Sequence, residues 1–158
     1  MRFNACKMPD SQAVIFILRR NPAKLTKEIP VNPIMQDKTE QKIQTADFTV
    51  YFEASEHTVV LIGSLRLNAA PEYEPISALM SSALEGLIAA GKPLLIVDVR
   101  ELKFLNSSGI NLLYQFVLKV RKQGGIGLKV LGSSSNAWQT KSLANMTKFM
   151  PTLQLAID

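Results

Sequence analysis

The residues best placed for chemistry are two adjacent serines, Ser107 and Ser108, which follow a short apolar segment and precede an amphipathic one. The spacing of the apolar side chains predicts a helix from about 107–109 to about Lys122. A hydroxyl at the start of a helix is exposed and lies near the positive end of the helix dipole, which favours a phosphate group there. The pair therefore predicts a phosphate-accepting loop, while a simpler interpretation has one serine capping the helix and the other solvated.

Other candidates for chemistry are weak. The chain has one cysteine, Cys6, and one histidine, His57, so we expect neither a metal site nor a Ser-His-Asp or Cys-His catalytic site. His57 falls in a predicted hairpin turn at the surface. Segment 132–135, Gly-Ser-Ser-Ser, follows a strand, and either an anion site or N-capping of the next helix would explain it. The only tryptophan, Trp138, is either half-buried core, the favoured interpretation, or a partner contact.

Length and composition fit one globular domain. The chain has 158 residues, of which 47% are hydrophobic and 20% charged. Its apolar runs are too short to span a bilayer, no signal peptide is recognised, and a single cysteine fits a cytoplasmic protein. The net charge of +5 is concentrated in residues 1–34, which carry six basic and two acidic groups. The rest is nearly neutral, which disfavours direct nucleic-acid binding.

Prolines separate an N-terminal extension from a regular domain. Four prolines between residues 9 and 33 interrupt any regular element, and residues 36–45 are polar without a periodic apolar face. Residues 1–46 are therefore expected to be a flexible, poorly ordered extension with one marginal element near residues 13–18. Met35 is an alternative to Met1 as the true start.

From residue 47 onward the pattern predicts alternating strands and helices. The runs 48–53 and 58–67, joined by a short turn, predict an antiparallel hairpin. The continuous apolarity of residues 93–99 predicts a strand that is covered on both faces. The other expected elements are a helix from 68–71 to about Ala90, the helix after the serine pair, a strand over 128–131, a helix over about 137–145 and a short strand or helix over 153–157. This order predicts an α/β fold, a small mixed β-sheet with crossover helices.

The region around the serine pair resembles the STAS-domain family, of the type of the anti-sigma-factor antagonists in bacterial partner-switching systems. The matching residues are Leu-Ile-Val-Asp-Val at 95–99, Phe-Leu-Asn-Ser-Ser-Gly at 104–109, the helix from Ile110, Lys-Gln-Gly-Gly at 122–125 and the strand 128–131. The order of elements also fits. The resemblance implies a STAS-like domain over residues 47–158 and does not cover residues 1–46.

What the resemblance implies is a non-catalytic signalling module without a cofactor. In the family, a serine kinase of the histidine-kinase-like ATPase type, which is also the anti-sigma factor, phosphorylates the second serine, and a metal-dependent serine phosphatase resets the switch. Ser108 is then the expected phosphorylation site, and Ser107 the helix cap or a minor site. The family usually has aspartate at the position of Asn106, whose amide keeps the hydrogen bonding and loses the charge.

The resemblance also places the partner surface around this switch. A phosphate would weaken binding there through its charge and bulk, and so control transcription. The expected partner-binding residues are Asn106, Ser107, Gly109, Asn111, Tyr114 and Gln115. The first alternative is a STAS-type subunit of a transport or lipid-trafficking assembly that docks constitutively. The second, a small enzyme, is disfavoured because no acid–base pair is visible.

Overall fold

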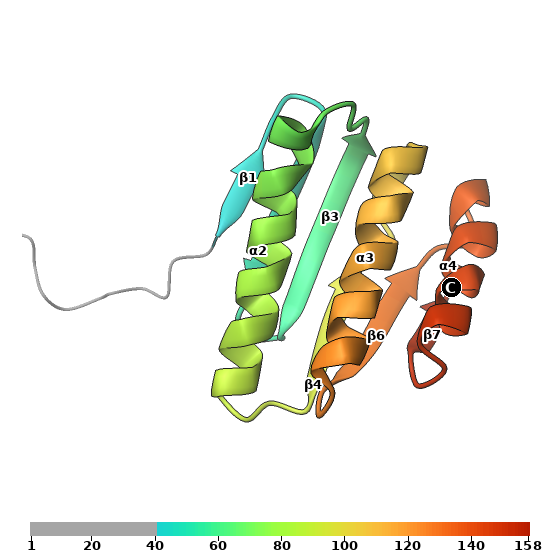
Figure 1. Ribbon diagram of the computed structural model, residues 1–158. Coiled ribbons are helices and arrows are strands. Elements are labelled where there is room, and N and C mark those ends of the chain that lie inside the picture. The colour runs from blue at the N-terminus through green and yellow to red at the C-terminus, as the bar shows by residue number, and fades with distance from the viewer. Residues whose placement is uncertain (1–40) are drawn as a thin grey trace, which may run out of the picture. The chain divides into compact units, whose positions relative to one another are not determined.

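Seven strands form one mixed sheet in the computed structural model, which describes residues 41–158 (Figure 1). Of the expected extension, only positions 41–46 belong to these residues. The marginal element near residues 13–18 and the alternative start at Met35 lie outside them. In chain order the elements are β1 (Lys42–Gln44), β2 (Phe48–Glu53), β3 (Thr58–Leu65), α2 (Ala70–Ala89), β4 (Leu94–Asp98), β5 (Leu102–Leu105), α3 (Ser107–Gln123), β6 (Gly127–Gly132), α4 (Ala137–Phe149) and β7 (Gln154–Ile157).

The sheet has the order β1-β2-β3-β4-β6-β7, and β5 pairs with β3 beside this path. The predicted hairpin is confirmed, because β2 and β3 pair antiparallel from Phe48 opposite Gly63 to Glu53 opposite Thr58. The pairs β3–β4, β4–β6 and β6–β7 are parallel. Each parallel connection needs a crossover, and α2, α3 and α4 provide them, as the alternating pattern predicts.

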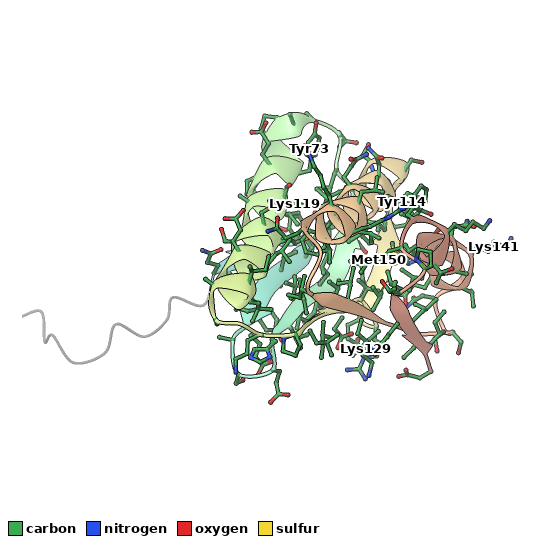
Figure 2. All side chains as sticks on the ribbon, turned by 60° about the horizontal axis from the view of Figure 1, so that its bottom comes forward. Tyr73, Tyr114, Lys119, Lys129, Lys141 and Met150 are labelled. Atoms are coloured by element: carbon green, nitrogen blue, oxygen red, sulfur yellow. The ribbon has the colours of Figure 1, made fainter. Side chains whose placement is uncertain are left out.

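The core lies between the sheet and the three helices of the described part of the chain, which share one side of the sheet (Figures 1 and 2). The inner side of α3 is buried at Leu113, Phe116, Val117 and Val120. Leu113, Phe116 and Val117 surround a small cavity together with alternate residues of the central strands, among them Val97 in β4. Burial of this side holds α3 against the sheet and so fixes the loop that precedes it.

Within residues 41–158, helices cover only one face of β4, so this part of the chain does not itself supply the predicted cover on both faces. Leu95 and Val97 point toward the helices and are buried, whereas Leu94 and Ile96 on the opposite face are half-buried. Neighbouring strands on both sides shield that second face in part. Lateral shielding in a central strand therefore accounts for the continuous apolar run.

Two short strands were not expected from the sequence. β1 pairs with β2 and lies within residues 1–46, which were expected to be a poorly ordered extension. β5 continues along β3 after β4 has ended, with an irregular register between Gly63 and Ser64. A side chain at Gly63 would collide with the backbone of Asp47, and its φ of 94° also favours glycine. The chain between β4 and the serine pair is thus a strand that delivers the pair to the end of the sheet.

Candidate functional site

Asn106, and not a serine, caps the N-terminus of α3. Its Oδ1 accepts hydrogen bonds from the backbone N–H of Gly109 at 3.1 Å and of Leu67 at 3.3 Å. Its Nδ2 donates to the carbonyl oxygen of Leu67 at 2.8 Å. The prediction that Ser107 caps the helix is therefore wrong, because Ser107 is already helical and the amide of Asn106 satisfies the free N–H group. The cap also ties α3 to the segment after β3.

Gly109 lets the first turn of α3 lie directly on β5. A Cβ at this position would collide with Cδ1 of Leu105 and lie 2.9 Å from its Cγ. Gly109 is buried, and any contact it makes with a partner is indirect. Its position gives it a packing role in the loop.

The two serine hydroxyls are left free by this arrangement. Ser107 and Ser108 are both exposed on the first turn of α3. Neither hydroxyl makes a hydrogen bond to any residue in the part of the chain that the structure describes. Ser108 therefore presents an unengaged hydroxyl at the positive end of the helix dipole.

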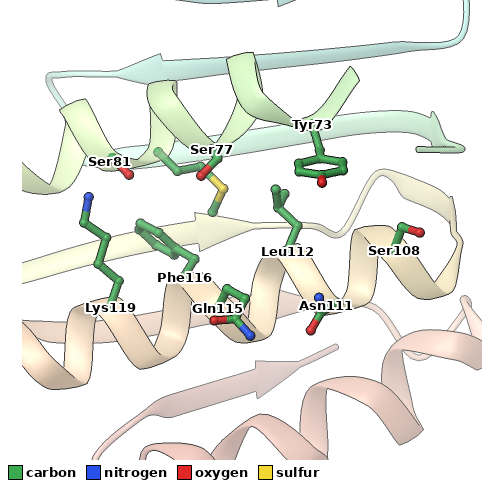
Figure 3. Close-up of a pocket in the computed structure, with 10 residues that line it drawn as sticks. Tyr73, Ser77, Ser81, Ser108, Asn111, Leu112, Gln115, Phe116 and Lys119 are labelled. Carbon is green, nitrogen blue, oxygen red and sulfur yellow. The ribbon is translucent and has the colours of Figure 1, made fainter. Parts of the chain in front are cut away.

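A groove of about 370 Å³ runs between α2 and α3, with Ser108 near one end and Lys119 near the other (Figure 3). Three of the α3 residues that line this groove were predicted from the sequence as the phosphorylation site or as partner contacts: Ser108, Asn111 and Gln115. Lys119 Nζ lies 3.3 Å from Oε1 of Glu85 in α2 and forms an ion pair with it. The full lining is Tyr73, Ser77, Met80, Ser81, Ser108, Asn111, Leu112, Gln115, Phe116 and Lys119.

The α2 side of this groove was missed in the sequence. Tyr73, Ser77 and Ser81 follow one another at four-residue spacing, so they share one face of α2. That spacing was the available signal. What the sequence could not give is the partner element, because the packing of α2 against α3 is a tertiary contact.

Tyr114 lies on the other side of α3, toward α4. Its hydroxyl donates to the carbonyl oxygen of Ser142 at 3.1 Å, and its ring centroid is 5.0 Å from that of Phe149. The structure therefore brings Ser108, Asn111 and Gln115 to one groove and places Tyr114 apart from them. Asn106 is half-buried and engaged in the hydrogen bonds of the cap.

The serine-rich turn after β6 is not organised to hold an anion. The N–H of Ser133 donates to Gln139 Oε1 at 2.6 Å, that of Ser134 to the Asp158 carbonyl at 2.8 Å, and that of Ser135 to Ser133 Oγ at 3.3 Å. Its backbone donors are thus already engaged. The N-capping alternative fails as well, because the cap residue of α4 is Asn136 and no side chain caps that helix.

Gln139 is a buried polar residue that the sequence analysis missed. Its side chain is 0% exposed, and besides accepting from Ser133 it donates to the carbonyl oxygens of Val99 at 2.6 Å and Leu102 at 3.0 Å. It fixes the turn between β4 and β5 against α4. Trp138 is half-buried and donates from Nε1 to the Leu102 carbonyl at 3.2 Å, which supports the core interpretation.

A charged pair lies at the same end of the sheet. Burial raises the pKa of the Asp98 carboxyl, but hydrogen bonds from the side chain and backbone of Arg100, together with its charge, hold that pKa below its usual range. Arg100 Nη2 is 2.7 Å from Asp98 Oδ2, and Asn136 donates to the Arg100 carbonyl oxygen at 3.1 Å. The pair orders the chain just before β5.

Within residues 41–158 no three His, Cys, Asp or Glu side chains gather closely enough to hold a metal ion. None of the described helices has the length and apolarity to cross a membrane. His57 lies in the predicted hairpin turn with a φ of 54°.

Comparison with known proteins gives matches at the level of structure. No protein-family model and no curated protein matches this sequence. One solved structure that is similar shows the diguanylate cyclase SiaD in complex with its activator SiaC, from Pseudomonas aeruginosa; its TM-score is 0.55 at 16% identity, over 73% of this chain and 96% of that chain. SiaC alone, also from Pseudomonas aeruginosa, is similar at a TM-score of 0.51 and 16% identity over 76% of this chain and 98% of its own.

An anti-sigma factor antagonist from Mycobacterium paratuberculosis is a more distant match. Its TM-score is 0.46 at 22% identity, over 71% of this chain and 90% of that chain. The likeness to SiaC shows the fold, which is STAS-like and mixed α/β, as the resemblance in sequence predicts.

Proposed function

We propose that this chain, which has a STAS-like fold, is a non-catalytic regulatory module whose binding to a partner protein is switched by phosphorylation of Ser108. The partner would be a serine kinase of the histidine-kinase-like ATPase type that also serves as the anti-sigma factor. A metal-dependent serine phosphatase would return the chain to its binding state.

The position of Ser108 carries this proposal. Its hydroxyl is exposed and has no hydrogen-bond partner among the described residues, because Asn106 takes over the capping of α3. A kinase can therefore reach it without breaking a bond of the fold. The product is favourable for the helix, since a phosphate near the first turn is stabilised by the dipole.

The surroundings of Ser108 explain why a phosphate would block binding. The modification adds about −1.5 to −2 charges at the mouth of the groove between α2 and α3. Lys119 is the one cation in the lining, and it lies near the opposite end, beside Glu85. The phosphate would therefore stay largely solvated, and a partner surface that packs on Asn111 and Gln115 would have to desolvate it.

The comparisons favour a second candidate for the output. SiaC is the activator of a diguanylate cyclase. A module of the same fold could use its groove on an enzyme of that kind in place of an anti-sigma factor, with the same switch at Ser108. A constitutively docked subunit of a transport or lipid-trafficking assembly is the alternative without any phosphate cycle.

Mass spectrometry of the chain isolated from its native cells tests the switch. We expect a species heavier by about 80 Da, with the phosphate mapped to Ser108. Ser108→Ala should abolish that species, whereas the matched variant Ser107→Ala should keep most of it. Phosphate on Ser133, Ser134 or Ser135 would show that a different loop is modified.

A further inference from the structure

Charge is segregated along the described part of the chain. Residues 41–101 carry eight acidic and four basic side chains. Residues 102–157 carry no acidic side chain and seven basic ones: Lys103, Lys119, Arg121, Lys122, Lys129, Lys141 and Lys148. Soluble surfaces usually intersperse both signs, and a large field of a single sign steers a partner.

Five of these cations belong to the two neighbouring helices α3 and α4, and four of them, Arg121, Lys122, Lys141 and Lys148, lie outside the groove that Lys119 lines. Arg121 and Lys122 lie in the last turn of α3, and Lys148 in that of α4. Lys141 is seven residues before Lys148, so both project from the same outer side of α4. All four are exposed, and within residues 41–158 none has an ion pair.

An aromatic pair lies between α3 and α4, beside Arg121. Phe149 is 36% exposed, and its ring lies 5.0 Å from that of Tyr114, which also bridges α3 and α4 in Figure 2. Arg121 donates from Nη1 to the Phe149 carbonyl oxygen at 2.8 Å, which holds the end of α4 against α3. An aromatic side chain on a rigid support beside an arginine is the composition that dominates binding energy at protein interfaces.

We infer that this surface, the basic helical face formed by Arg121, Lys122, Lys141 and Lys148 together with Tyr114 and Phe149, binds an acidic amphipathic segment of a partner protein. The cations would pair with its carboxylates, and Phe149 would take its apolar side chains. This inference goes beyond the switch at Ser108 and does not rest on it.

The chemistry of the face favours an acidic protein segment over other polyanions. Four exposed cations on two neighbouring helices, together with an exposed aromatic ring, match a helix with acidic and apolar sides. Nucleic acid calls for a longer basic track, and the described residues have a near balance of charge. A membrane surface calls for several apolar side chains that can insert, and Phe149 is the only exposed large hydrophobic residue on α3 and α4.

Distance separates the cations at the end of α3 from the switch. Lys122 is fourteen residues after Ser108 on the same helix, which corresponds to about 20 Å. The Debye length at physiological ionic strength is about 8 Å, so a charge at Ser108 is largely screened at Lys122. The attraction between these cations and an acidic segment should therefore be independent of a charge at Ser108.

The experiment measures binding of a fluorescent synthetic helical peptide of about 16 residues, with glutamates on one side and leucines on the other, by anisotropy. The double variant Lys122→Glu/Lys148→Glu should weaken binding by at least about fivefold. The matched charge reversal Lys42→Glu/Lys103→Glu lies on other elements and should change it less than about twofold. Phe149→Ala should weaken binding without a change of charge, and Ser108→Asp should leave it within about twofold.

Several results would overturn the inference. One is an equal loss of peptide binding in the two double variants. A second is equally tight binding of a peptide that has lysines in place of the glutamates. A third is tighter binding of duplex DNA or phosphatidylglycerol vesicles than of the acidic peptide, through Lys122 and Lys148. Concentration-dependent self-association that these substitutions abolish would instead assign the face to a second copy of the chain. Circular dichroism confirms that each variant is folded.

Discussion

Replacing Asn106 with alanine should destabilise the whole domain, although the residue lies in a surface loop. The substitution removes the helix cap at Gly109, which contributes about 1 kcal/mol. It also removes the bonds to the backbone N–H and carbonyl oxygen of Leu67, at 3.3 and 2.8 Å, which contribute about 0.5–1.5 kcal/mol each. The free energy of unfolding should therefore fall by about 2–4 kcal/mol.

Aspartate at the same position separates the two parts of this loss. Asn106→Asp keeps an acceptor for the N–H groups of Gly109 and Leu67, and adds a charge that the helix dipole stabilises by about 0.3–1 kcal/mol. It cannot donate to the Leu67 carbonyl oxygen, and it places a carboxylate oxygen against it. We expect a cost of about 1–2 kcal/mol, smaller than that of alanine.

Urea unfolding followed by circular dichroism measures these values. The matched control is Asn111→Ala, which changes the same side chain on an exposed position of α3 and should stay within about 0.5 kcal/mol of the parent. An Asn106→Ala variant with the unfolding free energy of Asn111→Ala would refute the role of Asn106 as the link between α3 and Leu67.

Three other changes test the rest of the fold. Phe116→Ala should cost about 3–5 kcal/mol in urea unfolding, because the side chain is 6% exposed under α3, and an unchanged denaturant midpoint would contradict this packing. Asp98→Asn should cost about 1 kcal/mol at pH 7, discounted because Arg100 is 46% exposed. Since the pKa of Asp98 is lowered in the fold, this contribution is present above about pH 4 and lost as pH falls through the lowered value, so the two proteins should converge in acid unfolding curves. A chain that starts at Asp37 retains β1 and should unfold within about 1 kcal/mol of the full chain, and a loss of several kcal/mol would show that the preceding residues pack on the domain.

The periodic elements could be predicted from the sequence because their signals are local. The hairpin of β2 and β3, the helices α2, α3 and α4, and the strands β4 and β6 follow from alternation, apolar runs and helical spacing. β5 was not predicted because it is only four residues long, and its exposed residues Lys103 and Phe104 interrupt any apolar pattern. β1 was not predicted because it is a short, polar strand at the edge of the sheet.

The candidate site was predictable only in part, for a different reason. The motif located Ser108 and the start of α3, both of which are encoded within a few residues. The cap by Asn106 depends on Leu67, which is 39 residues away in the sequence. The groove depends on α2 packing against α3, and the buried role of Gln139 depends on two carbonyl groups from other elements. Tertiary contacts of this kind leave no local pattern.

The central claim, a binding surface that phosphorylation of Ser108 turns off, is tested most directly by calorimetry with the partner that co-purifies with the Ser108→Ala chain. We predict that the phosphorylated chain and Ser108→Asp bind this partner more weakly than Ser108→Ala by at least about tenfold, while all of them keep the same fold. Equal affinities of the alanine variant, the aspartate variant and the phosphorylated chain would contradict the switch and favour a constitutively docked subunit.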